Sequence, residues 1–475
     1  MTEIEDVLQF LTAKIIDYVK GAENDDVKVT KLFDPKKLQG ELVKEFPIGT
    51  EGQGLPTFKK FTDFLLENSV ATWNPRFLEK LYAGTNPVGV ASDMLLSVLN
   101  TNSHVFTASP ALTVIEKYVG RKYAAMFGFP EETAGGLTFP GGSYSNITSL
   151  QIARSIMFPE SKEHGVTEKL AVFASEHSHY SVSKAAILLG LGSASVYKVG
   201  VDAEGRMDVT DLVKKIEQSK ADGRVPFYVT ATSGTTVYGS FDPIDEIAAV
   251  TKPRNLWLHV DGSWGGNVVF SPTHAHNVRG SHLAQSITVN PHKLLGVPTT
   301  CSFLLLPQMS TFLKANSMAA DYLFHGDDSN GDTFDLASGT MGCGRRPDAL
   351  KLYTAWQFYG TTGFAARIDH AFEMTGYLSK LVAAHPDLVL QTASPPPFLQ
   401  TCFFYAPHGK LRSASETSAD TRRINDRLRE DGKFLVDYNP DPEKGEFFRV
   451  VINSPNVTRP LLDELVDSIV SYGAK

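Results

Sequence analysis

Short apolar runs alternate with segments of helical periodicity through the middle of the chain. The runs are rich in β-branched and aromatic residues, which is typical of buried strands. Seven of them are candidate strands, at residues 136–140, 170–174, 194–199, 227–232, 256–260, 286–289 and 301–306. Intervening segments have the periodicity of helices, at residues 145–157, 181–190, 208–220 and 243–250. This alternation predicts one large α/β domain, built on a mostly parallel sheet with helices on both faces.

The two ends of the chain differ from this middle part. Residues 1–75 are predicted to form helices separated by polar, proline-containing loops, and the first helix has an apolar face that the chain or a partner must cover. After a long helical stretch, residues 399–407 and 446–454 are predicted strands. We therefore predict an N-terminal helical segment at 1–75, a large domain at 76–355 and a smaller C-terminal α/β domain at 356–475.

Composition and charge narrow the class of protein. Among 475 residues, 53 are acidic and 45 are lysine or arginine, so the net charge is −8. No basic face is available to neutralise phosphates, which argues against nucleic acid as a partner. Cys301, Cys343 and Cys402 are scattered, which argues against disulfides and cysteine-based zinc sites and favours a cytoplasmic location. No apolar stretch approaches the ~20 residues that span a bilayer, and the acidic N-terminus is unlike a signal peptide, so we expect no membrane partner.

Polar side chains follow several predicted strands, at the sheet edge where ligands bind in such folds. Gly141, Gly142 and Ser143 open a helix after the first strand. This turn could hold an anion such as a phosphate, or it could be a plain strand-to-helix turn with a serine cap. His177 and His179 follow the second strand. They could bind a metal, place one ring flat on an aromatic ligand, or lie in a surface loop.

Asp261 and Lys293 follow two further apolar runs. A carboxylate at the end of a buried strand needs a partner, which a metal or a cationic ring nitrogen would supply, unless Asp261 is only a turn or cap residue. Lys293 is flanked by apolar residues, and desolvation there would disfavour its charged form. A neutral amine forms imines with aldehydes, whereas a surface lysine would extend its ammonium group into water.

These four features together fit one ligand, pyridoxal 5′-phosphate. Its phosphate needs a helix N-terminus, its ring needs a flat partner such as His179, and its aldehyde needs an amine. Its pyridine nitrogen needs an acid, because only the protonated ring is a strong electron sink. A charge-assisted hydrogen bond of that kind contributes about 1.5–3 kcal/mol. The combination predicts a pyridoxal-phosphate site centred on Lys293 and Asp261, without a metal.

From about residue 74 to residue 458 the chain also resembles a known family. The motifs that carry this resemblance include PGGSYSN, SEHSHYS, HVDGSWGG, NPHKLLGVP, CGRRPDALKLYTAW and FFRVVINSP. The family is that of the group II pyridoxal-phosphate amino-acid decarboxylases, nearest the glutamate and cysteine-sulfinate branch. The resemblance implies fold type I (aspartate-aminotransferase-like), with a seven-stranded, mostly parallel sheet and a smaller C-terminal α/β domain. It also implies a homodimer with a shared active site, in which residues 1–75 serve dimerisation.

The resemblance implies roles for individual residues in binding the cofactor. Lys293 resembles the Schiff-base lysine, Asp261 the partner of the pyridinium and His179 the stacking histidine. Further contacts to the cofactor are implied for Gly142, Ser143, Thr235, Asn290 and His292. Relatives usually have two alanines after the strand-end Asp, whereas this chain has Gly262 and Ser263. We expect the Ser263 hydroxyl to lie against the ring face of the cofactor.

Four residues are candidates for lining the substrate site. Arg449 occupies the place of an arginine that, in the glutamate branch, holds the distal carboxylate of the substrate, and a guanidinium suits a carboxylate or sulfinate. Aromatic decarboxylases carry an arginine near this place too, so Arg449 favours acidic aliphatic substrates without fixing them. Lys80 replaces a polar amide of the glutamate branch, which argues against strict glutamate specificity. Phe106 and Tyr144 could line an aromatic pocket or simply pack.

The most consequential departure from the family is Phe334. In relatives, a loop tyrosine just before an Asp is thought to protonate the carbanion after carbon dioxide leaves, and the best match here is Phe334 before Asp335. A phenylalanine has no proton to give. Alternative donors are His179, Tyr322, His325 or a water molecule. In aromatic relatives, a phenylalanine at this place accompanies reaction with dioxygen, which gives aldehyde, ammonia and peroxide.

Three functional hypotheses follow. The first is a lyase that decarboxylates an L-amino acid, with acidic aliphatic substrates slightly favoured, to an amine and carbon dioxide. The second is decarboxylation with oxidative deamination to an aldehyde, motivated by Phe334. The third is a non-catalytic binding protein, which the presence of both Lys293 and Asp261 argues against. No feature favours aminotransferase or desulfurase activity over decarboxylation.

Overall fold

The computed structural model describes residues 3–24, 26–318 and 333–475, which form two compact units. The larger unit comprises residues 85–373 and 396–399. The smaller unit comprises residues 1–84, 374–395 and 400–475. The two ends of the chain therefore share a unit, while the three-part division made from the sequence stays a prediction. No helix among the described residues is both long enough and apolar enough to cross a membrane.

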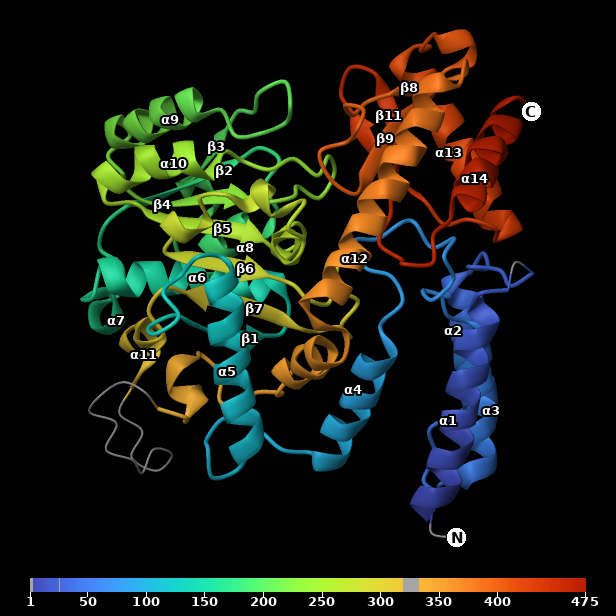
Figure 1. The fold of residues 1–475 in the computed structure, drawn as a ribbon, viewed down its shortest axis with the longest axis horizontal. Helices are drawn as coiled ribbons and strands as arrows, with labels where there is room; N and C mark the ends of the chain where they lie inside the picture. The colour runs from blue at the N-terminus through green and yellow to red at the C-terminus, as the bar shows by residue number, and fades with distance from the viewer. Residues whose placement is uncertain (1–2, 25, 319–332) are drawn as a thin grey trace. The chain divides into compact units, whose positions relative to one another are not determined.

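The larger unit is built on a seven-stranded sheet (Figure 1). Its strands are β1 (Gly135–Phe139), β2 (Leu170–Ser175), β3 (Val196–Val199), β4 (Val225–Thr232), β5 (Trp257–Gly262), β6 (Ser286–Val289) and β7 (Ser302–Leu306). They lie in the order β1-β7-β6-β5-β4-β2-β3. β7 is antiparallel to both neighbours, and the other described pairs are parallel. All seven strands expected from the apolar runs are present, and the expectation of a mostly parallel sheet is confirmed.

Helices pack against this sheet and complete its core. The α-helices of the larger unit are α4 (Pro87–Leu99), α5 (Pro110–Met126), α6 (Gly142–Met157), α7 (Ser161–His164), α8 (Ser181–Leu188), α9 (Val209–Ala221), α10 (Ile244–Thr251) and α11 (Ser310–Asn316). Helix α12 (Ala349–Ala384) begins in this unit and is interrupted at Gly360, where φ is 66°. Every residue of β1, β2, β5, β6 and β7 is buried, as expected for strands covered by helices. The four predicted helices correspond to α6, α8, α9 and α10.

The smaller unit joins the first and last parts of the chain. It contains α1 (Glu3–Ala22), α2 (Pro35–Glu45), α3 (Gly54–Glu67), α13 (Ala414–Asp431) and α14 (Arg459–Gly473). Its antiparallel sheet has the order β10-β11-β9-β8, formed by Asp437–Asp441, Gly445–Val451, Gln400–Tyr405 and Leu388–Leu390. Strands β9 and β11 match the two predicted strands, whereas β8 and β10 were not predicted. Val29 N donates to Gly432 O at 2.8 Å, and Leu78 N donates to Leu435 O at 2.9 Å, so the N-terminal segment is hydrogen-bonded to the C-terminal part.

Short 3₁₀ turns occupy several connections. They cover Ser193–Ser195, Lys252–Arg254, Gly266–Phe270, Ala275–Val278, Ser281–Leu283, Leu336–Gly339 and Pro407–Gly409.

The register of the central strands places the ends of β4, β5 and β6 at one edge. Thr232 is opposite Asp261 across the β4–β5 pair, and Asp261 is opposite Thr288 across the β5–β6 pair. Because these strands are parallel, the residues that follow them emerge at the same edge of the sheet.

Candidate active site

A cavity opens at the carboxyl ends of β4, β5 and β6. Eight of the residues proposed from the sequence line it: Gly142, Ser143, His179, Asp261, Ser263, Asn290, His292 and Lys293. Thr235 is buried between two lining residues, Gly234 and Thr236, and its hydroxyl accepts a hydrogen bond from Ser240 N at 3.0 Å. Residues from four strand ends and one helix start therefore meet in one place.

Asp261 is almost fully buried at the end of β5, with an exposed fraction of 4%. Its Oδ2 accepts a hydrogen bond from Asn146 Nδ2 at 2.8 Å, and its Oδ1 accepts one from Ser263 N at 3.1 Å. Burial alone would raise the pKa of Asp261. Interactions with His179, Ser263 and Lys293 outweigh burial and hold that pKa below its usual value. Asp261 is therefore a carboxylate at neutral pH, able to hold a cationic ring nitrogen.

Lys293 lines the same cavity, three residues beyond Asn290. Burial lowers the pKa of its amine, and the nearby charge of Asp261 opposes that shift only in part. Desolvation thus increases the neutral fraction of the amine, which is the form that attacks an aldehyde.

His179 presents a defined tautomer to the cavity. Its Nδ1 accepts a hydrogen bond from Ser181 N at 3.2 Å, so the neutral ring carries its proton on Nε2. Burial lowers the pKa of His179, which keeps the ring neutral near pH 7. The His177 ring has other contacts, because its Nδ1 lies 3.4 Å from Gly205 O and the ring lies 5.1 Å from the Tyr238 ring.

The start of α6 forms a close-fitting cradle. Gly141 has φ of 107°, a conformation that glycine adopts without strain, and no side chain caps the helix. A Cβ added to Gly142 would lie 2.6 Å from Ser263 Oγ and 2.7 Å from Asn290 Nδ2. In the described part of the chain, the buried Asn290 Oδ1 has no hydrogen-bond partner. The space beside Gly142 is too small for a side chain, and it lies at the helix start. Such a space suits an anionic group, because the N–H groups of a helix start favour negative charge.

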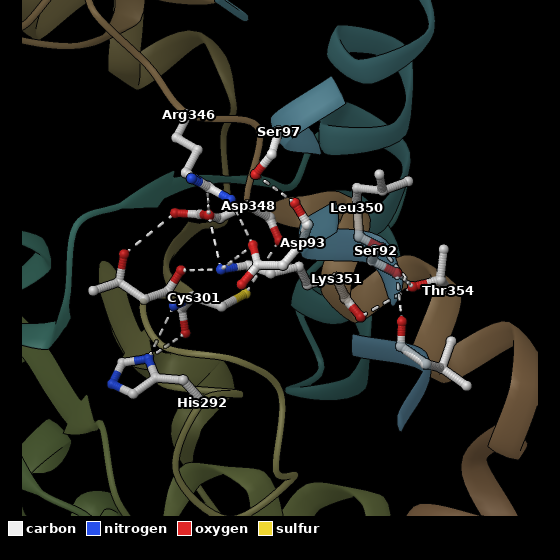
Figure 2. Close-up of polar contacts among 12 residues, drawn as sticks. Ser92, Asp93, Ser97, His292, Cys301, Arg346, Asp348, Leu350, Lys351 and Thr354 are labelled. Carbon is white, nitrogen blue, oxygen red and sulfur yellow. Dashed lines mark hydrogen bonds and ion pairs between the residues drawn. The ribbon is translucent and has the colours of Figure 1, made fainter. Parts of the chain in front are cut away.

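His292 connects this cavity to a buried ion-pair cluster (Figure 2). Its Nδ1 lies 2.7 Å from Cys301 O, and burial lowers the pKa of His292 to about 4. Next to Cys301, Lys351 has an exposed side-chain fraction of only 1%. Lys351 Nζ donates to Thr300 O at 2.8 Å and pairs with Asp348 Oδ1 at 2.9 Å. The cluster therefore fixes the loop against which His292 rests.

Phe334 and Phe106 form a separate contact within the larger unit. Their ring centroids are 5.8 Å apart, and Lys117 Nζ lies 4.1 Å from the Phe334 ring centroid. Asp335 Oδ1 accepts a hydrogen bond from Phe106 N at 2.8 Å, which ties the two segments together. Neither phenylalanine is among the residues that line the cavity. Of the alternative proton donors, Tyr322 and His325 fall outside the described residues.

Arg449 and Lys80 belong to the smaller unit. Arg449 is buried in β11, directly opposite Asp437 in β10, and its Nη2 donates to Asp437 Oδ2 and to Glu79 O. Lys80 Nζ lies 3.2 Å from Glu79 Oε1 and 3.9 Å from Asp437 Oδ2. An internal carboxylate thus already pairs with the arginine that was predicted to bind the substrate.

The sequence interpretation gave no role to several residues at this site. Asn146 and His259 lie beside Asp261, and Trp264 and Tyr180 line the cavity. Asn146 and His259 both stand inside motifs that were singled out. Their polarity within apolar segments was the available signal, because buried polar side chains need partners.

The fold and this cavity define a fold type I pyridoxal-phosphate enzyme, and comparisons with known proteins agree. Residues 55–405 match the model of the pyridoxal-dependent decarboxylase conserved domain. An L-aspartate decarboxylase of Metarhizium robertsii is 44% identical over 470 residues, covering 95% of this chain and 93% of that protein. A glutamate decarboxylase-like protein of Gibberella zeae is 38% identical over 511 aligned positions, covering 99% and 97%.

A solved structure is also similar over its full length. The crystal structure of mouse CSAD has a TM-score of 0.93 and 33% sequence identity, covering 99% of this chain and 98% of that one. The chain belongs to the pyridoxal-dependent decarboxylase family, within group II. It is a carboxy-lyase that uses pyridoxal phosphate and acts on a small amino acid.

The residues of the cavity fit this cofactor. The cradle at Gly142, with the N–H groups at the start of α6, suits the phosphate. Asp261 suits the ring nitrogen, and the amine of Lys293 suits the aldehyde. The observed geometry therefore agrees with the chemistry of pyridoxal phosphate.

Proposed function

We propose that this chain removes the α-carboxylate of an acidic aliphatic L-amino acid, L-aspartate first among them, to give an amine and carbon dioxide. The observation that carries this proposal is the placement of Lys293 and Asp261 in one cavity, with both pKa values lowered. The 44% identity to an L-aspartate decarboxylase supports the choice of substrate.

Each cavity residue has a task in this proposal. Lys293 would hold the cofactor through its amine. Asp261 would keep the ring nitrogen protonated, and His179 would border the ring, with its Nε2 proton available at the cavity. Gly142, Ser143, Asn290 and His292 hold the phosphate, Thr235 supports that loop, and Ser263 borders the ring. When bound, pyridoxal phosphate supplies an electron sink for the pair released with carbon dioxide.

Arg449 and Lys80 are the proposed anchors for the distal acid of the substrate. The group consisting of Arg449, Lys80, Arg429, Glu79 and Asp437 has three positive and two negative side chains. Within this group the positive side chains outnumber the negative ones by one, which would favour the approach of a substrate carboxylate. Because Asp437 already pairs with Arg449, the substrate carboxylate must share the Arg449 guanidinium with Asp437.

We therefore predict that Asp437→Asn lowers KM for L-aspartate by roughly threefold to tenfold, with little change in kcat, because it removes a competing charge. Steady-state assays of carbon dioxide release measure both constants. Glu446→Gln is a matched control, because Glu446 forms a similar pair with Arg422 at 2.7 Å, and its KM should be unchanged. A higher KM for Asp437→Asn would mean that Asp437 orients Arg449 instead.

A homodimer that shares its active sites is part of the proposal. In the larger unit, large apolar side chains are more than half exposed on neighbouring helices α4, α5 and α12: Leu95, Val98, Leu99, Tyr118 and Phe358. Large apolar side chains exposed on neighbouring helices are the kind of surface that protein interfaces bury. A partner would also cover the exposed Ile4 and Ile16 of α1.

Phe334 favours a second candidate function. A phenylalanine beside Phe106 and Lys117 offers no hydroxyl to protonate the substrate carbon. Dioxygen would then be the co-reactant, and one amino acid, one dioxygen and one water would give aldehyde, carbon dioxide, ammonia and hydrogen peroxide. His179 is the described alternative donor for the amine-forming reaction.

One experiment separates the two outcomes. A panel of L-amino acids is incubated in air with an oxygen electrode, and the products are identified by mass spectrometry. We expect amine in proportion to carbon dioxide, without oxygen uptake, and L-aspartate among the best substrates. Oxygen uptake equal to carbon dioxide release would establish the aldehyde-forming reaction instead, and Phe334→Tyr should then move the product towards amine.

A further inference from the structure

A continuous chain of buried hydrogen bonds ends at Asp261. Asn146 Nδ2 donates to Asp261 Oδ2 at 2.8 Å, and Asn146 Oδ1 lies 3.0 Å from His259 Nε2. His259 Nδ1 lies 2.9 Å from Ser286 Oγ, and Trp257 Nε1 donates to Ser286 Oγ at 2.9 Å. All five side chains are buried in the larger unit, and His259 is fully inaccessible.

The two end groups, Asp261 and Trp257, fix the direction in which these hydrogen bonds donate. Asp261 as a carboxylate only accepts, so Asn146 must turn its NH₂ group towards Asp261 and its carbonyl towards His259. His259 Nε2 must then carry a proton to donate to that carbonyl. At the other end, the Trp257 indole only donates, so the Ser286 hydroxyl proton is available for His259 Nδ1.

The protonation state of His259 agrees with this direction. Burial lowers the pKa of His259 to about 4, so the ring is neutral near pH 7 and has one N–H and one acceptor nitrogen. Ser149 Oγ, at 3.0 Å, is a second hydroxyl that faces Nδ1, and it also contacts the Tyr228 hydroxyl at 2.9 Å. Along the path from Trp257 through Ser286, His259 and Asn146, each residue can therefore donate towards Asp261. Hydrogen bonds aligned in one direction polarise one another.

We propose that His259 and Asn146 are positioning residues that orient Asp261 and keep it ionised, so that this carboxylate can hold a protonated ring nitrogen. The inference rests on the proposed role of Asp261. Without the His259 N–H, the Asn146 amide loses the partner that fixes its orientation. Rotation of that amide would then turn an oxygen towards the carboxylate.

The test compares two cofactors on the purified apoenzyme. One is pyridoxal phosphate, and the other is its 1-deaza analogue, in which a C–H group replaces the ring nitrogen. Both carry the aldehyde and the phosphate. The dissociation constant of the 1-deaza analogue divided by that of pyridoxal phosphate therefore reports only on the nitrogen. For the unaltered chain we expect tighter binding of pyridoxal phosphate. His259→Phe should lower this ratio roughly tenfold, as loss of a supporting hydrogen bond commonly does at buried sites.

Three further variants make the result specific. His259→Gln keeps an N–H near the Nε2 position and should retain the ratio. Tyr228→Phe removes a hydroxyl that lies beside the chain of hydrogen bonds, and it should also retain the ratio. Trp257→Phe removes the first donor and should lower the ratio by about twofold to threefold, which keeps the inference testable if His259→Phe does not fold.

One result would overturn the proposed role of Asp261, and a different result would overturn only the inference about His259 and Asn146. An unaltered chain that binds both cofactors equally would show that Asp261 does not face the ring nitrogen, which overturns the proposed role of Asp261. Discrimination by the unaltered chain that persists in His259→Phe and Trp257→Phe would overturn the inference about the positioning residues alone.

Discussion

Lys293→Ala is expected to abolish amine formation, with kcat reduced by about 10³-fold or more, because no other group would hold the cofactor aldehyde in the cavity. Reduction with borohydride should leave the variant unlabelled. In the unaltered chain, the same treatment should attach the cofactor irreversibly to the peptide that contains Lys293. Peptide mapping by mass spectrometry measures the label directly and does not depend on knowing the substrate.

Lys184→Ala is the matched control for this experiment. Lys184 is an exposed lysine whose Nζ lies 4.6 Å from the ring of the cavity residue Tyr180. Its loss should leave both the label and the turnover within about twofold, as expected for a surface charge. A label on a lysine other than Lys293 would contradict the assignment of Lys293.

Lys351→Met is expected to lower the free energy of unfolding by about 3–5 kcal/mol, because it removes the nearer of the two positive charges beside the buried Asp348. Lys351 pairs with Asp348 at 2.9 Å, and both side chains are at most 6% exposed. Burial already raises the pKa of Asp348, against the charge of Lys351, so removal of the lysine would raise that pKa further. Denaturant unfolding monitored by circular dichroism at pH 7 measures the change.

Two variants show whether the lost pair is the cause. Lys220→Met breaks an exposed pair with Glu217 at 2.8 Å and should change stability by less than about 1 kcal/mol. The double variant Lys351→Met with Asp348→Asn should recover part of the loss, because it also removes the buried negative charge. If Lys351→Met unfolds like the unaltered chain, the ion pair does not stabilise the fold.

Local patterns were sufficient to predict the large sheet. Its strands are apolar runs that alternate with amphipathic helices along the chain. Each element could therefore be predicted from its own residues. The approximate position of the cavity followed from the same logic. Asp261 stands at the end of β5 and Lys293 follows the adjacent parallel strand β6, so their proximity is a consequence of topology.

Features that depend on distant pairing were not predictable in this way. Strand β10 contains Asp437, Asn439, Pro440 and Asp441 and has no apolar alternation, so only its pairing with β11 makes it a strand. The ion pair between Asp437 and Arg449 depends on that same register. The hydrogen bonds from Trp257 to Asp261 join residues of three different elements, and nothing in the sequence spacing indicates them.

The smaller unit has a consequence for synthesis on the ribosome. Its hydrogen bonds join Val29 to Gly432 and Leu78 to Leu435, so they form only after almost the entire polypeptide has been translated. The larger unit, completed by residue 399, emerges earlier, and domains generally fold as units during synthesis. The segments at Val29 and Leu78 must therefore wait for the last part of the nascent chain, and termination before residue 432 would leave Val29 N and Leu78 N without these backbone partners.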